Sequence, residues 1–66
     1  MKNPEPIRVV MTDRDDGSRT TVHMREGDVR CCRISRATGL PNYVVMARLN
    51  AGEELQTAGF IYRKET

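Results

Sequence analysis

The sequence predicts a small α+β domain with the order ββαββ, in which one helix joins two β-hairpins and packs on a four-stranded antiparallel sheet. Three observations lead to this fold class. Short runs towards both ends of the chain alternate apolar and polar residues with the period of a strand. An Asp-Gly pair between the first two runs is typical of a hairpin turn. A segment near the middle has helical periodicity and capping residues at both ends.

The first hairpin is predicted over residues 7–25. The run 7–12 is rich in β-branched residues. The run 19–25 has the same alternation of inward-facing and outward-facing positions. One side of these two strands would carry the apolar residues Ile7, Val9, Met11, Val22 and Met24 together with Thr20. Asp16-Gly17 lies between the runs, and glycine accepts the positive φ that a tight turn requires. We therefore expect two antiparallel strands, half-buried on one face.

Residues 29–38 are predicted to form the helix. Read as a strand, this segment has no apolar face. On a helical wheel the arginines separate from the side that carries Ile34 and the two cysteines. Asp28 is a good N-cap, and Gly39 can take the left-handed position after the last turn. Pro41 then prevents the helix from continuing.

The second hairpin is predicted from the rest of the chain. Residues 43–49 are β-favouring at their start and alternate Tyr43, Val45, Ala47 and Leu49 on one face, which predicts a third strand. Residues 50–53 have turn character, and 55–63 would be a fourth strand with Gly59 as a bulge or close-approach point. Residues 1–6 would be an extended lead and 64–66 a frayed tail of a single domain spanning 1–66.

Two segments also support a different fold. Residues 34–41 (ISRATGLP) resemble the end of the first helix and the turn of a helix-turn-helix, and residues 55–61 (LQTAGFI) are similar to the segment leading into a wing in winged-helix regulators. This resemblance covers about half of the chain. It implies a recognition helix over 42–51, with Asn42, Tyr43, Met46 and Arg48 near bases or phosphates. The threonine-rich segment 18–27 departs from that pattern, because it is a poor first helix.

Positive charge is concentrated in one stretch of the chain. The formal net charge is +2, yet residues 1–28 hold five bases against six acids and residues 49–66 hold two against three. Between Asp28 and Glu53 there is no carboxylate but there are four arginines: Arg30, Arg33, Arg36 and Arg48. Arginine binds phosphate and carboxylate through a planar fork of donors. We expect these four residues to bind an acidic macromolecule, either nucleic acid or an acidic protein surface.

The inventory of reactive residues is thin. His23 is the only histidine, and the aspartates around residues 13–16 lack the ligand spacing of a calcium loop. Cys31 and Cys32 lack the spacing of a structural zinc site. They would fill the core, or be reactive thiols beside Arg30 and Arg33. No nucleotide-binding or hydrolase motif is present. We therefore expect a non-enzymatic protein without metal or cofactor.

Two hypotheses about function remain. The first is a binding or regulatory module whose arginine helix face engages an acidic partner, with nucleic acid favoured. The second is an accessory regulator or inhibitor that occupies a site on a larger protein, for example through an exposed strand edge over 55–62. With 38% hydrophobic residues in 66, the core must be small, which favours a homodimer that shares apolar surface. No apolar run is long enough for a membrane span or signal peptide, so we expect a cytoplasmic protein with no membrane partner.

Overall fold

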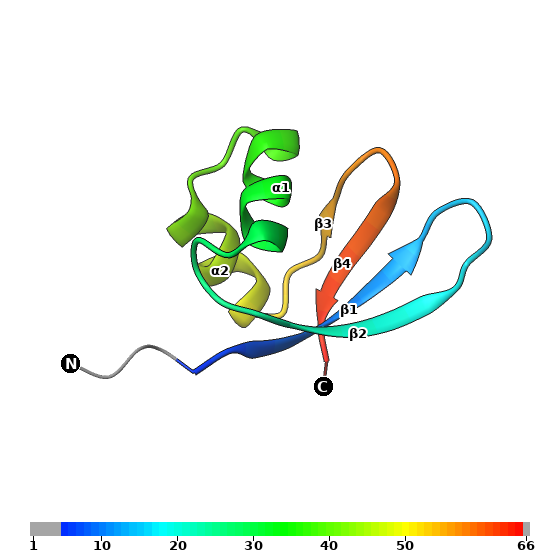
Figure 1. Cartoon of the computed structure of the whole chain (residues 1–66), viewed down its shortest axis with the longest axis horizontal. Coiled ribbons are helices and arrows are strands. Elements are labelled where there is room, and N and C mark those ends of the chain that lie inside the picture. Colours follow the sequence, from blue (N-terminus) through cyan, green and yellow to red (C-terminus); the bar gives the residue numbers. More distant parts are fainter. Residues whose placement is uncertain (1–4, 66) are drawn as a thin grey trace.

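Four antiparallel strands form one sheet, and two consecutive helices cover one of its faces (Figure 1). The computed structural model describes residues 5–65. The elements in chain order are β1 (Ile7–Asp13), β2 (Arg19–Met24), α1 (Val29–Thr38), α2 (Asn42–Asn50), β3 (Leu55–Gln56) and β4 (Phe60–Lys64). The strand order is β2-β1-β4-β3, so the central pair joins opposite ends of the chain. The α+β class with four antiparallel strands is confirmed.

The hairpin of β1 and β2 is formed as predicted. Val9 lies opposite Val22 and Ile7 lies opposite Met24, which places the apolar positions of both strands on the same face. Val9, Val22 and Met24 are buried, whereas the outward-facing His23 is exposed. The strands are joined by a turn in which Gly17 has a φ of 75°, a left-handed conformation that favours glycine.

Helix α1 also has the predicted boundaries. Its N-cap Asp28 accepts a hydrogen bond of 2.8 Å from the backbone N–H of Cys31 through Oδ1, and another of 2.8 Å from the N–H of Arg25 through Oδ2. At the other end Gly39 has a φ of 74° and donates its N–H to the carbonyl of Ser35 at 2.9 Å. Cys31 and Ile34 are buried on the sheet side. Local capping chemistry thus fixes both ends of the helix.

The strand predicted over residues 43–49 is wrong, because this segment forms helix α2. The buried residues are Val45 and Leu49, which are four positions apart, while Tyr43 is 65% exposed and Ala47 is exposed. The alternation was therefore accidental, and the i, i+4 spacing is the one that packs. The chain thus has the order ββααββ, not ββαββ. Residues 42–50 are helical, as the helix-turn-helix resemblance implies, but residues 18–27 contain strand β2 where that pattern requires a helix.

The single strand predicted over residues 55–63 is divided into two. Leu55 pairs with Tyr62 and Gln56 with Ile61, so the segment is itself a hairpin. It turns at residues 57–59, where the N–H of Thr57 donates to the carbonyl of Phe60 at 2.8 Å. The predicted fraying from residue 64 is also incorrect. Lys64 is in β4, and the N–H of Glu65 donates to the carbonyl of Arg8 at 2.9 Å.

The helices and the sheet enclose one small apolar core. Its nine buried residues are Val9, Val22, Met24, Cys31, Ile34, Val45, Leu49, Leu55 and Tyr62. They come from all six elements, so neither hairpin nor the helix pair has a complete core of its own. Within residues 5–65, no helix lies over the opposite face of the sheet (Figure 1). Of the predicted terminal segments, residues 1–4 and 66 lie outside the described part of the chain, and residues 5–6 are in no helix or strand. Within residues 5–65, no helix has the length and apolar character needed to cross a membrane.

Candidate nucleic-acid interface

Three arginines lie on the solvent side of α1. Arg30, Arg33 and Arg36 are exposed, and Arg33 lies about 60° around the helix from each of the others. Cys31 and Ile34 anchor the opposite side of the helix in the core. The same packing that buries the apolar side therefore presents the three guanidinium groups to solvent. We call these three residues the arginine face.

No acid forms an ion pair with the arginine face within residues 5–65. The one ion pair of that range joins Arg8 to Glu65 at 3.2 Å, on the far side of the sheet. Glu54 accepts a hydrogen bond of 2.8 Å from Gln56 Nε2 and lines a hollow on the open face of the sheet. The positive field of the arginine face is therefore available to a partner.

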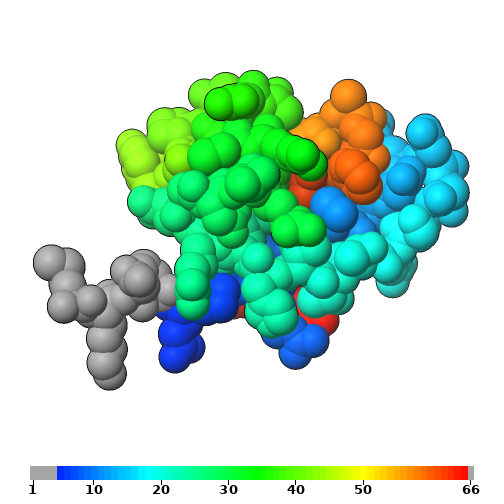
Figure 2. Space-filling view, in the orientation of Figure 1, coloured from blue at the N-terminus to red at the C-terminus, as the bar shows by residue number. Residues whose placement is uncertain are grey.

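A groove runs beside part of the arginine face. It has a volume of about 330 Å³ and lies between α1 and the connection of β3 with β4. Figure 2 shows these two segments, in green and orange, next to each other on one surface of the molecule. The residues around the groove are Met11, Arg30, Arg33, Ala37, Thr57, Ala58, Gly59, Phe60 and Tyr62. Arg36 is not among them, because it lies on the side of α1 that carries Cys32.

The outer wall of this groove is held by Arg14 from the first hairpin. The backbone N–H of Arg14 donates to the carbonyl of Gly59 at 3.0 Å, and its Nη1 donates to the carbonyl of Thr57 at 2.9 Å. Neither the groove nor this role of Arg14 was predicted from the sequence. The two segments are 43 residues apart, and no local pattern in the sequence signals their contact.

The residues implied by the helix-turn-helix resemblance do not share one surface of α2. Tyr43 and Arg48 are exposed, but they lie about 140° apart around the helix. Met46 is half-buried. The Nδ2 of Asn42 faces Cys32 Sγ at 3.7 Å, and its buried Oδ1 has no hydrogen-bond partner in the described structure. Arg48, the fourth arginine of the acid-free stretch, is in the last turn of α2 and is thus not part of the arginine face.

The two cysteines have different surroundings. Cys31 is fully buried, and burial raises the pKa of its thiol above the ordinary value. Cys32 is half-buried, and its Sγ lies 3.6 Å from the carbonyl oxygen of Gly27. Both thiols are free. Cys31 is therefore a core residue, and the raised pKa opposes the reactive thiolate that the neighbouring arginines suggested.

The remaining polar candidates do not converge on a site. Asp13 Oδ1 accepts from the N–H of Asp15 at 2.8 Å, and Asp16 Oδ1 accepts from the N–H of Ser18 at 2.8 Å, so these carboxylates close their own turn. The hydrogen bond with Ser18 lowers the pKa of Asp16. No group of three or more potential metal ligands occurs in residues 5–65. His23 is exposed and lies across from Arg8 on the open face of the sheet.

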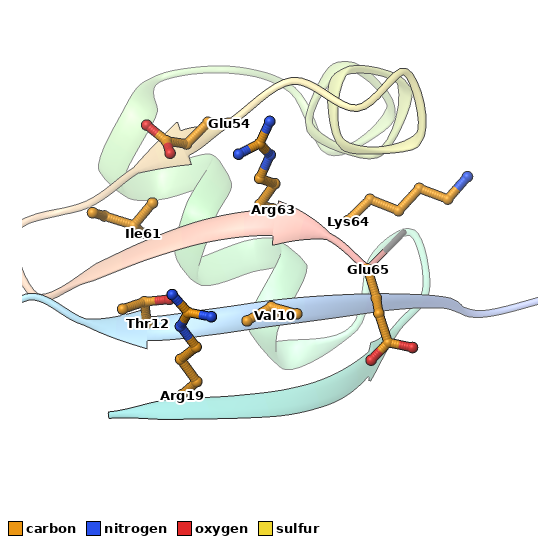
Figure 3. Close-up of a pocket in the computed structure, with 8 residues that line it drawn as sticks. All are labelled: Val10, Thr12, Arg19, Glu54, Ile61, Arg63, Lys64 and Glu65. Carbon is orange, nitrogen blue, oxygen red and sulfur yellow. The ribbon is translucent and has the colours of Figure 1, made fainter. Parts of the chain in front are cut away.

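A second concave surface, of about 570 Å³, lies on that open face (Figure 3). Val10 and Ile61 are half-buried there, and Arg19 and Arg63 flank them. Unlike the groove beside α1, this hollow also contains carboxylates, from Glu54 and Glu65. Its charge is therefore mixed.

In comparisons with known proteins, no family model, no curated protein and no solved structure matches this chain.

Proposed function

We propose that the protein is a small, non-enzymatic nucleic-acid-binding module that contacts phosphate groups through the arginine face of α1. The observation that carries the proposal is the set of three exposed arginines on one helix face, with no ion-pair partner in residues 5–65. Arginine forms strong, charge-assisted hydrogen bonds with phosphate oxygens. Each phosphate contact also releases counterions from the nucleic acid, which favours binding at low salt.

The binding mode would be contact with the sugar-phosphate backbone, with little sequence preference. Phe60 is half-buried and Tyr62 is buried, so neither offers a free ring face beside the arginines for base stacking. Tyr43 is exposed, but it lies on α2. Phosphate contacts position a protein on nucleic acid without reading its sequence.

The test is a fluorescence-anisotropy titration of a labelled, mixed-sequence DNA duplex and of its single strands at two salt concentrations. The variant Arg30→Ala/Arg33→Ala/Arg36→Ala should bind much more weakly at low salt and should lose most of the salt dependence. A matched control, Arg8→Ala/Arg19→Ala/Arg63→Ala, removes the same charge from the open face of the sheet and should keep most of the affinity. Circular dichroism checks that the triple arginine variant is folded. If the folded variant binds as tightly as the parent, the proposal is refuted.

A second candidate function is that of an accessory regulator that binds a larger protein. The hollow on the open sheet face favours it, because half-buried Val10 and Ile61 lie there between charged residues of both signs (Figure 3). Of the exposed edge predicted over 55–62, only the short strand β3 lies at an edge of the sheet, because β4 is an inner strand. The longer free edge is β2. A stoichiometric protein partner that survives nuclease treatment and is lost in Val10→Asp would support this role. Its retention by Val10→Asp would argue against the hollow.

A further inference from the structure

We infer that the groove between α1 and the β3–β4 connection holds one stretch of the phosphate backbone, with Arg30 and Arg33 on one wall and residues 57–59 on the other. The inference rests on the proposed function and goes further, because it names the path of the strand. It also divides the arginine face: Arg30 and Arg33 line the groove, and Arg36 does not.

Charge supports a phosphodiester as the occupant. Among the nine described residues that line the groove, Arg30 and Arg33 are the only charged ones, and none is acidic. The larger hollow on the open sheet face, in contrast, combines basic residues with Glu54 and Glu65. The nucleic-acid backbone is a chain of regularly spaced anions. The groove beside α1 attracts such a chain, whereas the carboxylates of the open-face hollow repel it in part.

The far wall of the groove adds neutral donors. Thr57, Ala58 and Gly59 form it, and within residues 5–65 no acceptor takes the backbone N–H of Ala58 or of Gly59. Free backbone N–H groups are common partners of phosphate oxygens. The wall is also fixed in place, because Arg14 binds the carbonyl groups of Thr57 and Gly59. Both bonds are accepted by carbonyl oxygens of the wall, so they leave the N–H groups of Ala58 and Gly59 available.

The floor of the groove is apolar. Met11 and Phe60 are half-buried, Tyr62 is buried, and the rings of Phe60 and Tyr62 lie 6.1 Å apart. An apolar floor offers the bases no hydrogen bonds. The groove is thus suited to attraction of phosphate without sequence preference.

Gly59 allows a test that leaves the arginines intact. A Cβ atom added at Gly59 meets no atom within 4 Å, and its φ is outside the left-handed region, so a side chain fits without strain. Gly59→Asp therefore places a negative charge on the wall opposite Arg30 and Arg33. Gly59→Asn adds a side chain of the same shape without the charge.

The expected result is that Gly59→Asp lowers affinity for a labelled DNA duplex or single strand at low salt about tenfold, while Gly59→Asn stays within about twofold of the parent. Arg30→Ala/Arg33→Ala should reduce the slope of log K against log salt by about two, and Arg36→Ala by less than one. The duplex and single-strand probes show which form of the backbone the groove accepts.

The outcomes separate this inference from the proposed function. If the triple arginine variant loses binding but Gly59→Asp binds as well as Gly59→Asn, the groove inference is wrong and the arginine face still stands. A loss of DNA affinity in Arg36→Ala as large as the loss in Arg33→Ala would also overturn the inference. If the parent binds neither probe at low salt, both proposals fail.

Discussion

Arg14 Nη1 donates a hydrogen bond of 2.9 Å to the carbonyl oxygen of Thr57, which joins the turn between β1 and β2 to the connection between β3 and β4. The backbone N–H of Arg14 reinforces this link at Gly59. The two hairpins are therefore connected at their tips as well as through the central β1–β4 ladder. This link positions the outer wall of the groove beside α1.

Loss of the Arg14 side chain should make the outer wall of the groove more mobile but should change the free energy of unfolding of the domain only slightly. Arg14→Ala removes one exposed hydrogen bond, so we expect the free energy of unfolding to fall by no more than about 1.5 kcal/mol. Amide hydrogen exchange should become faster at Thr57 and Phe60, whose N–H groups are hydrogen-bonded within this turn. Arg25→Ala is the control, because Arg25 is exposed and its side chain has no hydrogen-bond partner in the described structure. Equal exchange in the two variants would show that the side chain of Arg14 does not hold the wall.

Two glycines should respond in opposite ways to the same substitution. Neither Gly39 nor Gly59 has an atom within 4 Å of an added Cβ, but only Gly39 has a left-handed φ, of 74°. Gly39→Ala should therefore destabilise the protein by about 1 kcal/mol through backbone strain. Gly59→Ala should be neutral or stabilise it by up to about 1 kcal/mol, because alanine restricts the unfolded chain. Urea denaturation measures both, and equal shifts would contradict the assignment of Gly39 as the left-handed cap that follows α1.

Asp28 should be important for α1, because its two carboxylate oxygens accept from the N–H groups of Cys31 and Arg25. Asp28→Ala should cost about 0.5–2 kcal/mol, the range for a lost N-cap, in urea denaturation. Asp28→Asn and Asp28→Ser can still accept hydrogen bonds and should recover most of this loss. If Asp28→Asn is as unstable as Asp28→Ala, the cap is not the source of the stabilisation.

The two thiols should react at different rates with iodoacetamide. Cys32 should be modified first, because it is half-buried, whereas Cys31 is fully buried and its pKa is raised by that burial. Peptide mapping by mass spectrometry after a short exposure distinguishes them, with denatured protein as the control in which both react. Faster modification of Cys31 would contradict its place in the core.

The raised pKa of Cys31 also predicts the direction of a pH effect. The folded state keeps the thiol proton to higher pH than the unfolded state, whose pKa is near the ordinary value of 9.0. This contribution to stability is complete below that pH and is lost as the pH rises through the folded pKa. The free energy of unfolding should thus fall more steeply above pH 9 in the parent than in Cys31→Ala. Parallel curves would show that Cys31 does not contribute.

The sequence determined the elements whose signals are local. Helix α1 has an N-cap aspartate, a separated apolar side and a left-handed glycine within twelve consecutive residues, 28–39. The first hairpin likewise depends on neighbouring residues, through its turn and its alternation. The arginine face follows from helical periodicity once α1 is known. These three predictions needed no information about distant parts of the chain.

The tertiary structure decided what residues 42–64 do. Tyr43-Val44-Val45 favours a strand by intrinsic propensity, but β1 already pairs with β2 on one side and β4 on the other. As a helix, the segment instead buries Val45 and Leu49 against the core, where full burial of such a side chain contributes about 1.5–3 kcal/mol. The groove also depends on β4 pairing with β1 and on Arg14 reaching Thr57. Such contacts join residues far apart in the chain, so only the folded structure shows that Arg30 and Arg33 have a second wall facing them.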